Sequence, residues 1–204
     1  MLRRTFAFVT PSASFFADQL RSALGRRVPA TLTEEGAQRA SVALVVTAGA
    51  DSALLFVKRQ ERTGDPWSGH AALPGGFRSP GDATAAATAE RETEEETGLP
   101  LASAGELIGQ LDDQYPRSIH LPKVVVTPFV FVVPGRLPVA ASPEVQAALW
   151  VPVKRVLDPS SRLPFHLIRA GIQMEFESIH AGGLVIWGLT ERILSQLAEI
   201  SSPH

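Results

Sequence analysis

The hydrophobic positions of the chain follow two kinds of pattern, one typical of strands and one typical of helices. Apolar and β-branched runs at 40–46 and 53–59 are separated by the turn-forming stretch TAGADS, which predicts a β-hairpin. Further strand-like runs follow at 106–111, 123–133 and 147–153. Prolines in and beside these runs indicate breaks or edge strands.

Helical spacing occurs in three other segments. Residues 12–25 combine a serine cap, apolar positions at helical intervals and a terminal glycine, which predicts an amphipathic helix. Residues 82–98 are rich in alanine, with Asp82 as the expected N-cap and Gly98 just past the last turn. The end of the chain is apolar at helical spacing from Trp187 onward. Between the hairpin and the second helix, residues 60–82 are predicted to be mostly loop.

The order of these elements is helix, strands, helix, strands, helix. This order predicts an α/β fold in which a mixed sheet lies between helices. The length of 204 residues and the hydrophobic content of 45% suit a single globular unit with a real core. We expect a helical N-terminal extension, residues 1–38, packed on a domain formed by residues 39–204.

Composition excludes several classes of function. The formal net charge of −2 gives no general attraction to nucleic acid or to anionic membranes. No apolar run approaches the roughly 20 residues of a membrane span. The chain has no cysteine, which excludes disulfides, thiolate nucleophiles and cysteine-ligated zinc. These features lead us to expect a cytoplasmic protein.

The segment ERETEEETG holds five glutamates near the end of the second predicted helix. At about 100° per residue, Glu92, Glu95 and Glu96 share one stripe of the helix, whereas Glu90 and Glu94 project to the other side. Like charges at this spacing repel each other. The stripe is either a solvated helix face or a site for hard divalent cations, which prefer carboxylate and phosphate oxygens.

The loop before this helix favours the cation site. Residues 73–82 read LPGGFRSPGD, and a Pro-Gly-Gly backbone turns sharply and presents bare carbonyl and N–H groups. A glycine carbonyl beside three helical carboxylates makes an all-oxygen pocket for Mg²⁺ or Mn²⁺, completed by water and a substrate phosphate.

Loop and helix together resemble the signature of the Nudix hydrolases, G-x5-E-x7-R-E-U-x-E-E-x-G-U, in which U is apolar. The matching positions in the second half of the signature are Arg91, Glu92, Glu95, Glu96, Gly98 and Leu99. Two features differ from the signature. Thr93 replaces the aliphatic residue, and the first half reads Gly76-x5-Asp82-x8-Arg91, with aspartate for glutamate and one extra residue. We interpret Asp82 as a helix cap and not as a catalytic acid.

The resemblance implies an α/β/α sandwich and a Mg²⁺- or Mn²⁺-dependent attack of water on a diphosphate linked to another group X. The implied metal ligands are Glu92, Glu95, Glu96 and the Gly76 carbonyl. Arg91 would orient one of the glutamates. Two residues are candidates for the general base, Glu92 and Glu144, the latter in a loop marked by proline. The resemblance also implies a small-molecule partner and a possible homodimer.

Several segments outside the signature are similar to the coenzyme A pyrophosphatase branch of the family. They are LLFVKR followed by GHAALPGG, GQLDD (109–113), VTPFVFVVP (126–134) and VIWGLTERIL (185–194). The chain departs from the upstream motif of this branch, where it reads RQERTGDPWSG. Arg59 is one position out of register with the motif, and Trp67 replaces the histidine that the motif would have. Coenzyme A or an acyl derivative is the leading substrate. The alternatives are ADP-ribose, NADH, a nucleoside triphosphate, or a binding module without hydrolysis.

Six basic or potentially basic side chains could meet the phosphates of such a substrate. They are Arg59, Arg62, His70, Arg78, Arg117 and Lys123. Arg59 and His70 are the preferred candidates because they lie at a strand end and just before the Pro-Gly-Gly turn. Trp67 is a candidate for stacking on an adenine ring. No motif reads a base edge or follows a nucleic-acid backbone.

Overall fold

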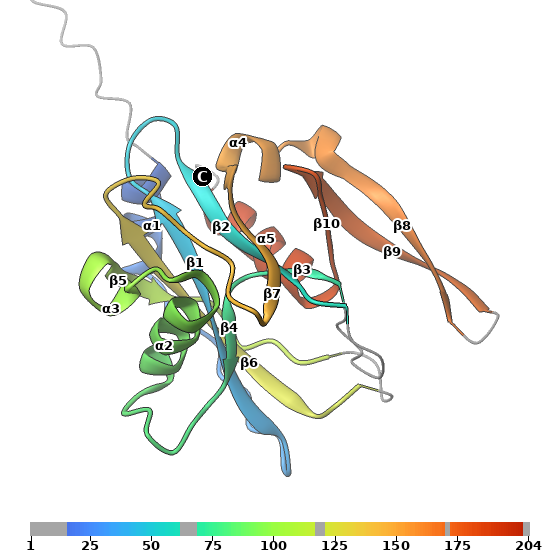
Figure 1. Cartoon of the computed structure of the whole chain (residues 1–204), viewed down its shortest axis with the longest axis horizontal. Helices are drawn as coiled ribbons and strands as arrows, with labels where there is room; N and C mark the ends of the chain where they lie inside the picture. Colours follow the sequence, from blue (N-terminus) through green and yellow to red (C-terminus); the bar gives the residue numbers. More distant parts are fainter. Residues whose placement is uncertain (1–15, 62–68, 117–120, 170–171, 202–204) are drawn as a thin grey trace, which may run out of the picture.

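The computed structural model describes residues 16–61, 69–116, 121–169 and 172–201 of the chain (Figure 1). The first half contains α1 (Phe16–Leu24), β1 (Gln38–Thr47), β2 (Ala53–Arg59), β3 (Ala71–Ala72), β4 (Gly75–Phe77), α2 (Ala85–Thr97), α3 (Leu101–Ala104) and β5 (Glu106–Gln110). The second half contains β6 (Val124–Val133), β7 (Val145–Pro152), α4 (Val153–Val156), the 3₁₀ turn η1 (Pro159–Ser161), β8 (Arg162–Arg169), β9 (Ile172–Ala181), β10 (Leu184–Trp187) and α5 (Gly188–Ser201).

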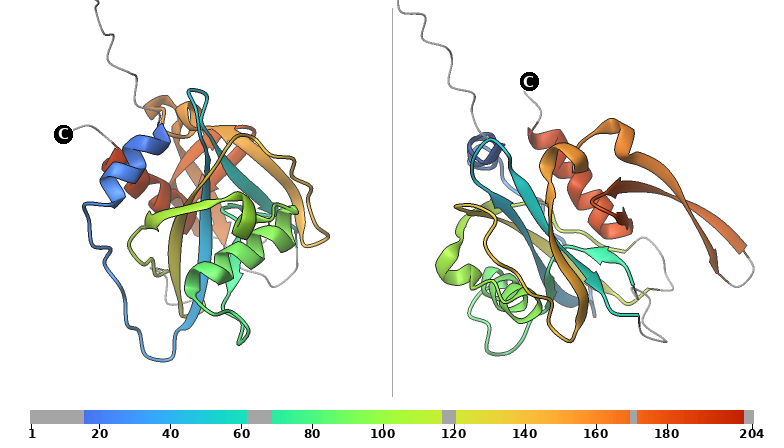
Figure 2. Two further views of the ribbon diagram at one scale, coloured as in Figure 1. Left: turned by 90° about the vertical axis from the view of Figure 1, so that its left-hand side faces the viewer. Right: turned by 45° about the horizontal axis from the view of Figure 1, so that its top comes forward.

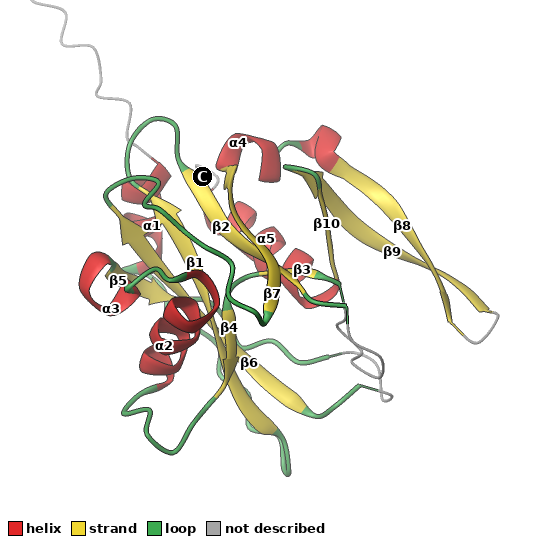
Figure 3. Cartoon of the chain, in the orientation of Figure 1, coloured by secondary structure: helices red, strands yellow, loops and turns green. Residues whose placement is uncertain are grey.

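Seven strands form a mixed central sheet (Figure 3). Its main order is β3-β2-β1-β6-β5, with β4 paired to β1 and β7 paired to β2. Strands β1 and β6 run parallel over their whole length, and the other pairs are antiparallel. The predicted hairpin is confirmed as β1 and β2, and the predicted mixed sheet is confirmed as well.

Helices cover both faces of this sheet (Figure 2). Along β1, Leu44 and Val46 belong to the core under α1 and α5, whereas Ala43 and Val45 belong to the core under α2 and α3. Successive residues of a strand point to opposite faces, so a sheet that is covered on both sides needs apolar residues throughout. The apolar run at 40–46 meets that need, and the expected α/β/α sandwich is confirmed.

A second, three-stranded sheet of order β10-β9-β8 was not predicted. Its β9 and β10 pack against α5, and the long β8 and β9 extend from the body of the molecule (Figure 1). The expectation of helical structure from Trp187 is close to the observed start of α5 at Gly188. The four residues before it form β10 instead.

The proline in β6 corrects the expectation that prolines mark breaks or edges. Pro128 lies inside β6, a central strand between β1 and β5. Proline has no N–H to donate. The ladder to β5 ends opposite Phe129, where Gln110 is the last paired residue, so β6 tolerates a missing donor at the next position.

The first predicted helix is present in the part of the chain that the structure describes. Helix α1 is described from Phe16 to Leu24, and the predicted residues 12–15 lie outside the described ranges. Leu20 and Leu24 of α1 are buried in the core shared with β1 and α5. None of the helices within the described ranges is long and apolar enough to cross a membrane.

Candidate active site

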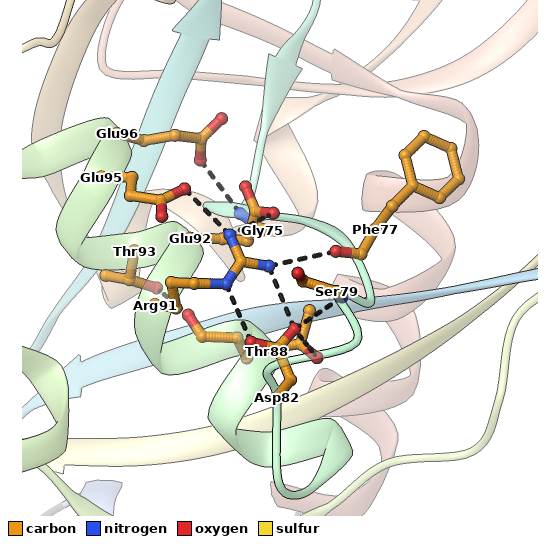
Figure 4. Close-up of polar contacts among 11 residues, drawn as sticks. Gly75, Phe77, Ser79, Asp82, Thr88, Arg91, Glu92, Thr93, Glu95 and Glu96 are labelled. Carbon is orange, nitrogen blue, oxygen red and sulfur yellow. Dashed lines mark hydrogen bonds and ion pairs between the residues drawn. The ribbon is translucent and has the colours of Figure 1, made fainter.

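The Pro-Gly-Gly turn is fixed on the edge of β1. The carbonyl of Pro74 accepts a hydrogen bond from the Ala43 amide at 2.8 Å. Gly75 has φ +154°, and a Cβ at this position would lie 2.3 Å from the carbonyl oxygen of Ser41, so only glycine fits. The Gly75 amide donates a hydrogen bond of 3.0 Å to Oε2 of Glu96 (Figure 4). The turn therefore positions a carboxylate of α2.

The next glycine lies against a second carboxylate. A Cβ at Gly76 would lie 2.4 Å from Cδ of Glu92. The side chain of Glu92 can occupy its place only because residue 76 has none. The two glycines thus bring Glu92 and Glu96 to the same short stretch of backbone, as the sequence predicted for the carboxylates of this stripe.

Arg91 links the loop after the turn to α2 (Figure 4). Its Nε and Nη2 donate to the two carboxylate oxygens of Asp82 at 2.9 and 3.1 Å, and Nη2 also donates to the Phe77 carbonyl. Its Nη1 donates to Glu95 and forms an ion pair with Glu92, both at 2.9 Å. The guanidinium therefore holds the loop and two glutamates of the stripe in one arrangement.

Asp82 is not the helix cap that the sequence predicted. Helix α2 begins at Ala85, and the N-cap is Thr84, whose hydroxyl accepts a hydrogen bond from the Ala87 amide. The carboxylate of Asp82 is turned to Arg91 and also accepts hydrogen bonds from the Ser79 amide and the Thr88 hydroxyl. These donors hold the pKa of Asp82 well below its usual value, chiefly through the bond with Arg91.

The carboxylates at this site are electrostatically crowded. The pKa of Glu96 is raised to about 7, mainly because the side chain is buried. The charges of Glu92 and Glu144 also raise it, whereas the Gly75 amide and the charge of Arg59 lower it. Burial raises the pKa of Glu92 as well. The site therefore stabilises added positive charge.

Glu144 lies in a loop that is tied to the end of α2. The amides of Ala140 and Ser142 donate to the carbonyls of Thr97 and Glu96 at 2.9 and 3.0 Å. The charge of Glu144 raises the pKa of both Glu92 and Glu96. Glu144 therefore belongs to the electrostatic environment of the glutamate stripe, as a candidate base must.

A cavity of about 570 Å³ opens beside the turn. Gly75, Gly76, Glu96, Arg59 and His70 line one part of it. Arg59 and His70 are neighbours because the Arg59 amide donates to the His70 carbonyl at 3.0 Å where β2 meets β3. The structure thus brings both preferred phosphate-binding candidates to the cavity that contains Glu96.

Comparisons with known proteins decide the family. The family model described as NUDIX domain matches residues 37–170 of the chain. The chain belongs to the Nudix family.

Curated Nudix relatives agree over most of the chain. The uncharacterized Nudix hydrolase NudL of Photorhabdus laumondii is 34% identical over 71% of this chain and 75% of its own length. The NudL of Yersinia pseudotuberculosis serotype O:1b is 31% identical over 79% of each. An uncharacterized protein of Schizosaccharomyces pombe is 39% identical over 52% of this chain, and the match spans 33% of that relative.

Solved Nudix structures share the fold at low sequence identity. A Nudix hydrolase from Alicyclobacillus acidocaldarius has a TM-score of 0.55 at 18% identity, over 83% of this chain and 95% of that one. A MutT/nudix family protein from Enterococcus faecalis has a TM-score of 0.54 at 18% identity, over 88% and 67%. At this identity the likeness establishes the Nudix fold alone.

The donors at the site fit the divalent cation that the Nudix resemblance implies. Glu92 and Glu96 offer carboxylate oxygens beside the backbone of Gly76, and hard divalent cations prefer such oxygen ligands. Among the described residues, no three acidic or histidine side chains are gathered into a complete metal site. The carboxylate of Glu95 is half exposed, and like that of Glu92 it lies 2.9 Å from Nη1 of Arg91.

The other basic side chains that were predicted as phosphate ligands are not seen at the cavity. Arg78 and Lys123 are exposed, and neither lines the cavity. Arg62, Trp67 and Arg117 lie outside the described residues.

Sequence reasoning missed the opposite wall of the cavity. Leu167, Met174 and Phe176 of the second sheet line it, together with Trp187 at the end of β10. A signal was present, since apolar residues alternate in LPFHL and again in MEF, which is the period of a strand.

Proposed function

We propose that this Nudix protein is a Mg²⁺- or Mn²⁺-dependent pyrophosphohydrolase that cleaves the diphosphate of a nucleoside diphosphate derivative. One observation carries the proposal. The cavity that contains Glu96 and the Gly75-Gly76 turn also contains Arg59 and His70. Oxygen donors for a cation and side chains for phosphate therefore line the same space.

Each residue has a distinct part in this proposal. Glu92, Glu95, Glu96 and the Gly76 carbonyl would hold the cation, which when bound neutralises phosphate charge and lowers the pKa of water. Arg91 positions Glu92 and Glu95 through its bonds to both. Arg59 and His70 bind phosphate oxygens. The proton of the attacking water goes to Glu92 or to Glu144, and both remain candidates.

The leading substrate is coenzyme A or an acyl derivative. Its support is the resemblance of several segments outside the signature to the coenzyme A pyrophosphatase branch. The departure at Arg59 and Trp67 supports the alternative group, ADP-ribose, NADH or a nucleoside triphosphate. We propose that Trp67 stacks on the adenine ring and that Arg59 binds the 3′-phosphate of coenzyme A.

A substrate panel tests both levels of the proposal. Coenzyme A, its dephospho form, ADP-ribose and NADH are incubated with Mg²⁺ or Mn²⁺, and the products are identified by mass. We expect adenosine 3′,5′-bisphosphate and the phosphopantetheine part from coenzyme A. The dephospho form should react about ten- to a hundredfold more slowly in kcat/KM, because one charge-assisted contact is lost.

The panel also distinguishes a wrong substrate assignment from a wrong assignment of hydrolase function. Coenzyme A ranking last would remove the coenzyme A assignment and keep the pyrophosphohydrolase. Tight binding of one compound without cleavage of any would identify a binding module instead.

We also propose that the protein is a cytoplasmic homodimer. Light scattering of the purified protein tests the dimer.

A further inference from the structure

The cavity that contains Glu96 is also lined by many apolar side chains. Its far wall is formed by Leu167, Met174 and Phe176 of the second sheet, with Leu189 and Ile193 of α5 beside them. These side chains have no group that donates to or accepts from an oxygen. The cavity therefore combines a few charged and polar side chains with a larger apolar lining.

The register of the β8–β9 hairpin explains why this wall is apolar. Phe165 pairs with Phe176, and Leu167 pairs with Met174, on one face of the hairpin. The opposite face alternates with it and carries exposed polar residues such as His166, paired with Glu175. Because alternate residues of a strand point to opposite faces, the hairpin turns its apolar side toward the cavity.

Trp187 connects the apolar wall to the charged end. Its ring centroid lies 4.9 Å from that of Phe176 and 5.1 Å from that of Phe165, both on the hairpin. It also lies 4.5 Å from the ring of His70. Tilted aromatic contacts of this kind hold the rings in fixed relative positions. A ligand with its diphosphate at His70 would therefore have the hairpin close to its group X.

We propose that the apolar face of β8–β9 binds an apolar tail carried by the group X of the substrate, and that Leu167 and Met174 set the preferred tail length. The proposal rests on the pyrophosphohydrolase function. A sugar or nicotinamide in this space would lose its hydrogen bonds to water without replacement from Leu167 or Met174. An alkyl chain loses none, and methionine adapts to its shape.

A series of acyl coenzyme A thioesters tests the length preference. We expect kcat/KM to rise from free coenzyme A through acetyl, butanoyl, hexanoyl and octanoyl thioesters. A buried methylene is worth about 0.8 kcal/mol, which corresponds to at most about fourfold per methylene. The rise should stop where the chain outgrows the cavity. Equal kcat/KM across the series would overturn the inference and leave the proposed function standing.

Matched variants locate the effect. Leu167→Trp fills the cavity and should lower kcat/KM for the octanoyl thioester at least tenfold while free coenzyme A keeps its value. Leu163→Trp is the control, since Leu163 lies on the same strand, is largely exposed and does not line the cavity. Met174→Ala enlarges the cavity and should move the optimum to longer chains. Identical chain profiles for all three variants and the wild type would contradict the proposal.

A binding measurement keeps the inference separate from the reaction. Butyl, hexyl and octyl phosphate are titrated into the full-length protein by calorimetry. Affinity should rise with chain length in the wild type and in Leu163→Trp, and should not rise in Leu167→Trp. This result supports the apolar wall even if coenzyme A is not cleaved. Affinity independent of chain length in the wild type would overturn it.

Discussion

Folding strongly raises the pKa of the buried Glu96 side chain. Its folded pKa of about 7 lies above the ordinary value of 4.5. Below pH 4.5 the carboxyl is protonated in both states and causes no loss of stability. Between pH 4.5 and 7 the carboxyl loses its proton in the unfolded chain but keeps it in the folded protein, so the free energy of unfolding falls as pH rises. Above pH 7 this loss of stability is complete.

Replacing Glu96 with glutamine removes this pH-dependent loss. The side-chain oxygen of glutamine can still accept the hydrogen bond from the Gly75 amide. Without divalent cations, Glu96→Gln should be more stable than the wild type above pH 7, by up to about 3 kcal/mol, since one pKa unit is worth about 1.4 kcal/mol. The difference should shrink toward pH 4.5. Thermal melts from pH 4.5 to 8 check this, and a difference that does not change with pH would contradict it.

The sequence predicted the positions of the glutamates better than their bonds. Helical periodicity placed Glu92 and Glu96 correctly beside the glycine turn, because it depends only on backbone geometry. The prediction of Asp82 as the N-cap was wrong, because Thr84 caps the helix and both residue types cap helices well. The choice depends on Arg91, which engages Asp82 across the loop.

At the scale of elements, the loop after β4 and helix α2 act together through Asp82. Its carboxylate accepts from Arg91, Thr88 and the Ser79 amide. Asp82→Asn removes the charge that holds Arg91. We expect a fall of several degrees in melting temperature and a loss of about 10- to 100-fold in kcat/KM, as is typical of a residue that orients ligands.

Asp51→Asn is the control for this change. Asp51 is exposed, and its contact with Lys154 is 4.0 Å, so the melting temperature and kcat/KM should both stay close to the wild-type values. Equal effects from the two substitutions would mean that Asp82 does not position Arg91.

The second sheet is the element that sequence reasoning missed. Its strands alternate as strands should, but β8 contains Pro164, a residue type that is unfavourable in strands, and the apolar face is only half buried. That face lines a cavity and does not fill a core, so its apolar run is short. The central strands were easier to predict because burial on both faces makes them apolar throughout.

At the scale of the whole molecule, α1 belongs to the main core. Leu20 is fully buried in the cluster that contains Phe56 and Leu194. Leu20→Ala should lower the free energy of unfolding by about 2–5 kcal/mol. Val28→Ala, at a position 92% exposed, should change it by no more than about 0.5 kcal/mol.

Urea unfolding followed by circular dichroism and by tryptophan fluorescence measures both variants. The two signals should coincide in one transition, with the midpoint moved only by Leu20→Ala. A separate early transition would show that the N-terminal extension folds independently of the domain.

The central claim is that one face of α2 performs metal-dependent cleavage of a diphosphate. Glu96 and Glu94 lie on the same helix, but Glu96 is buried at the cavity and Glu94 is exposed. The most direct test compares kcat/KM of Glu96→Gln and Glu94→Gln on the best diphosphate substrate at saturating Mn²⁺. We predict a loss of about 100-fold or more for Glu96→Gln and almost none for Glu94→Gln. Equal losses, or full activity in both, would contradict the account.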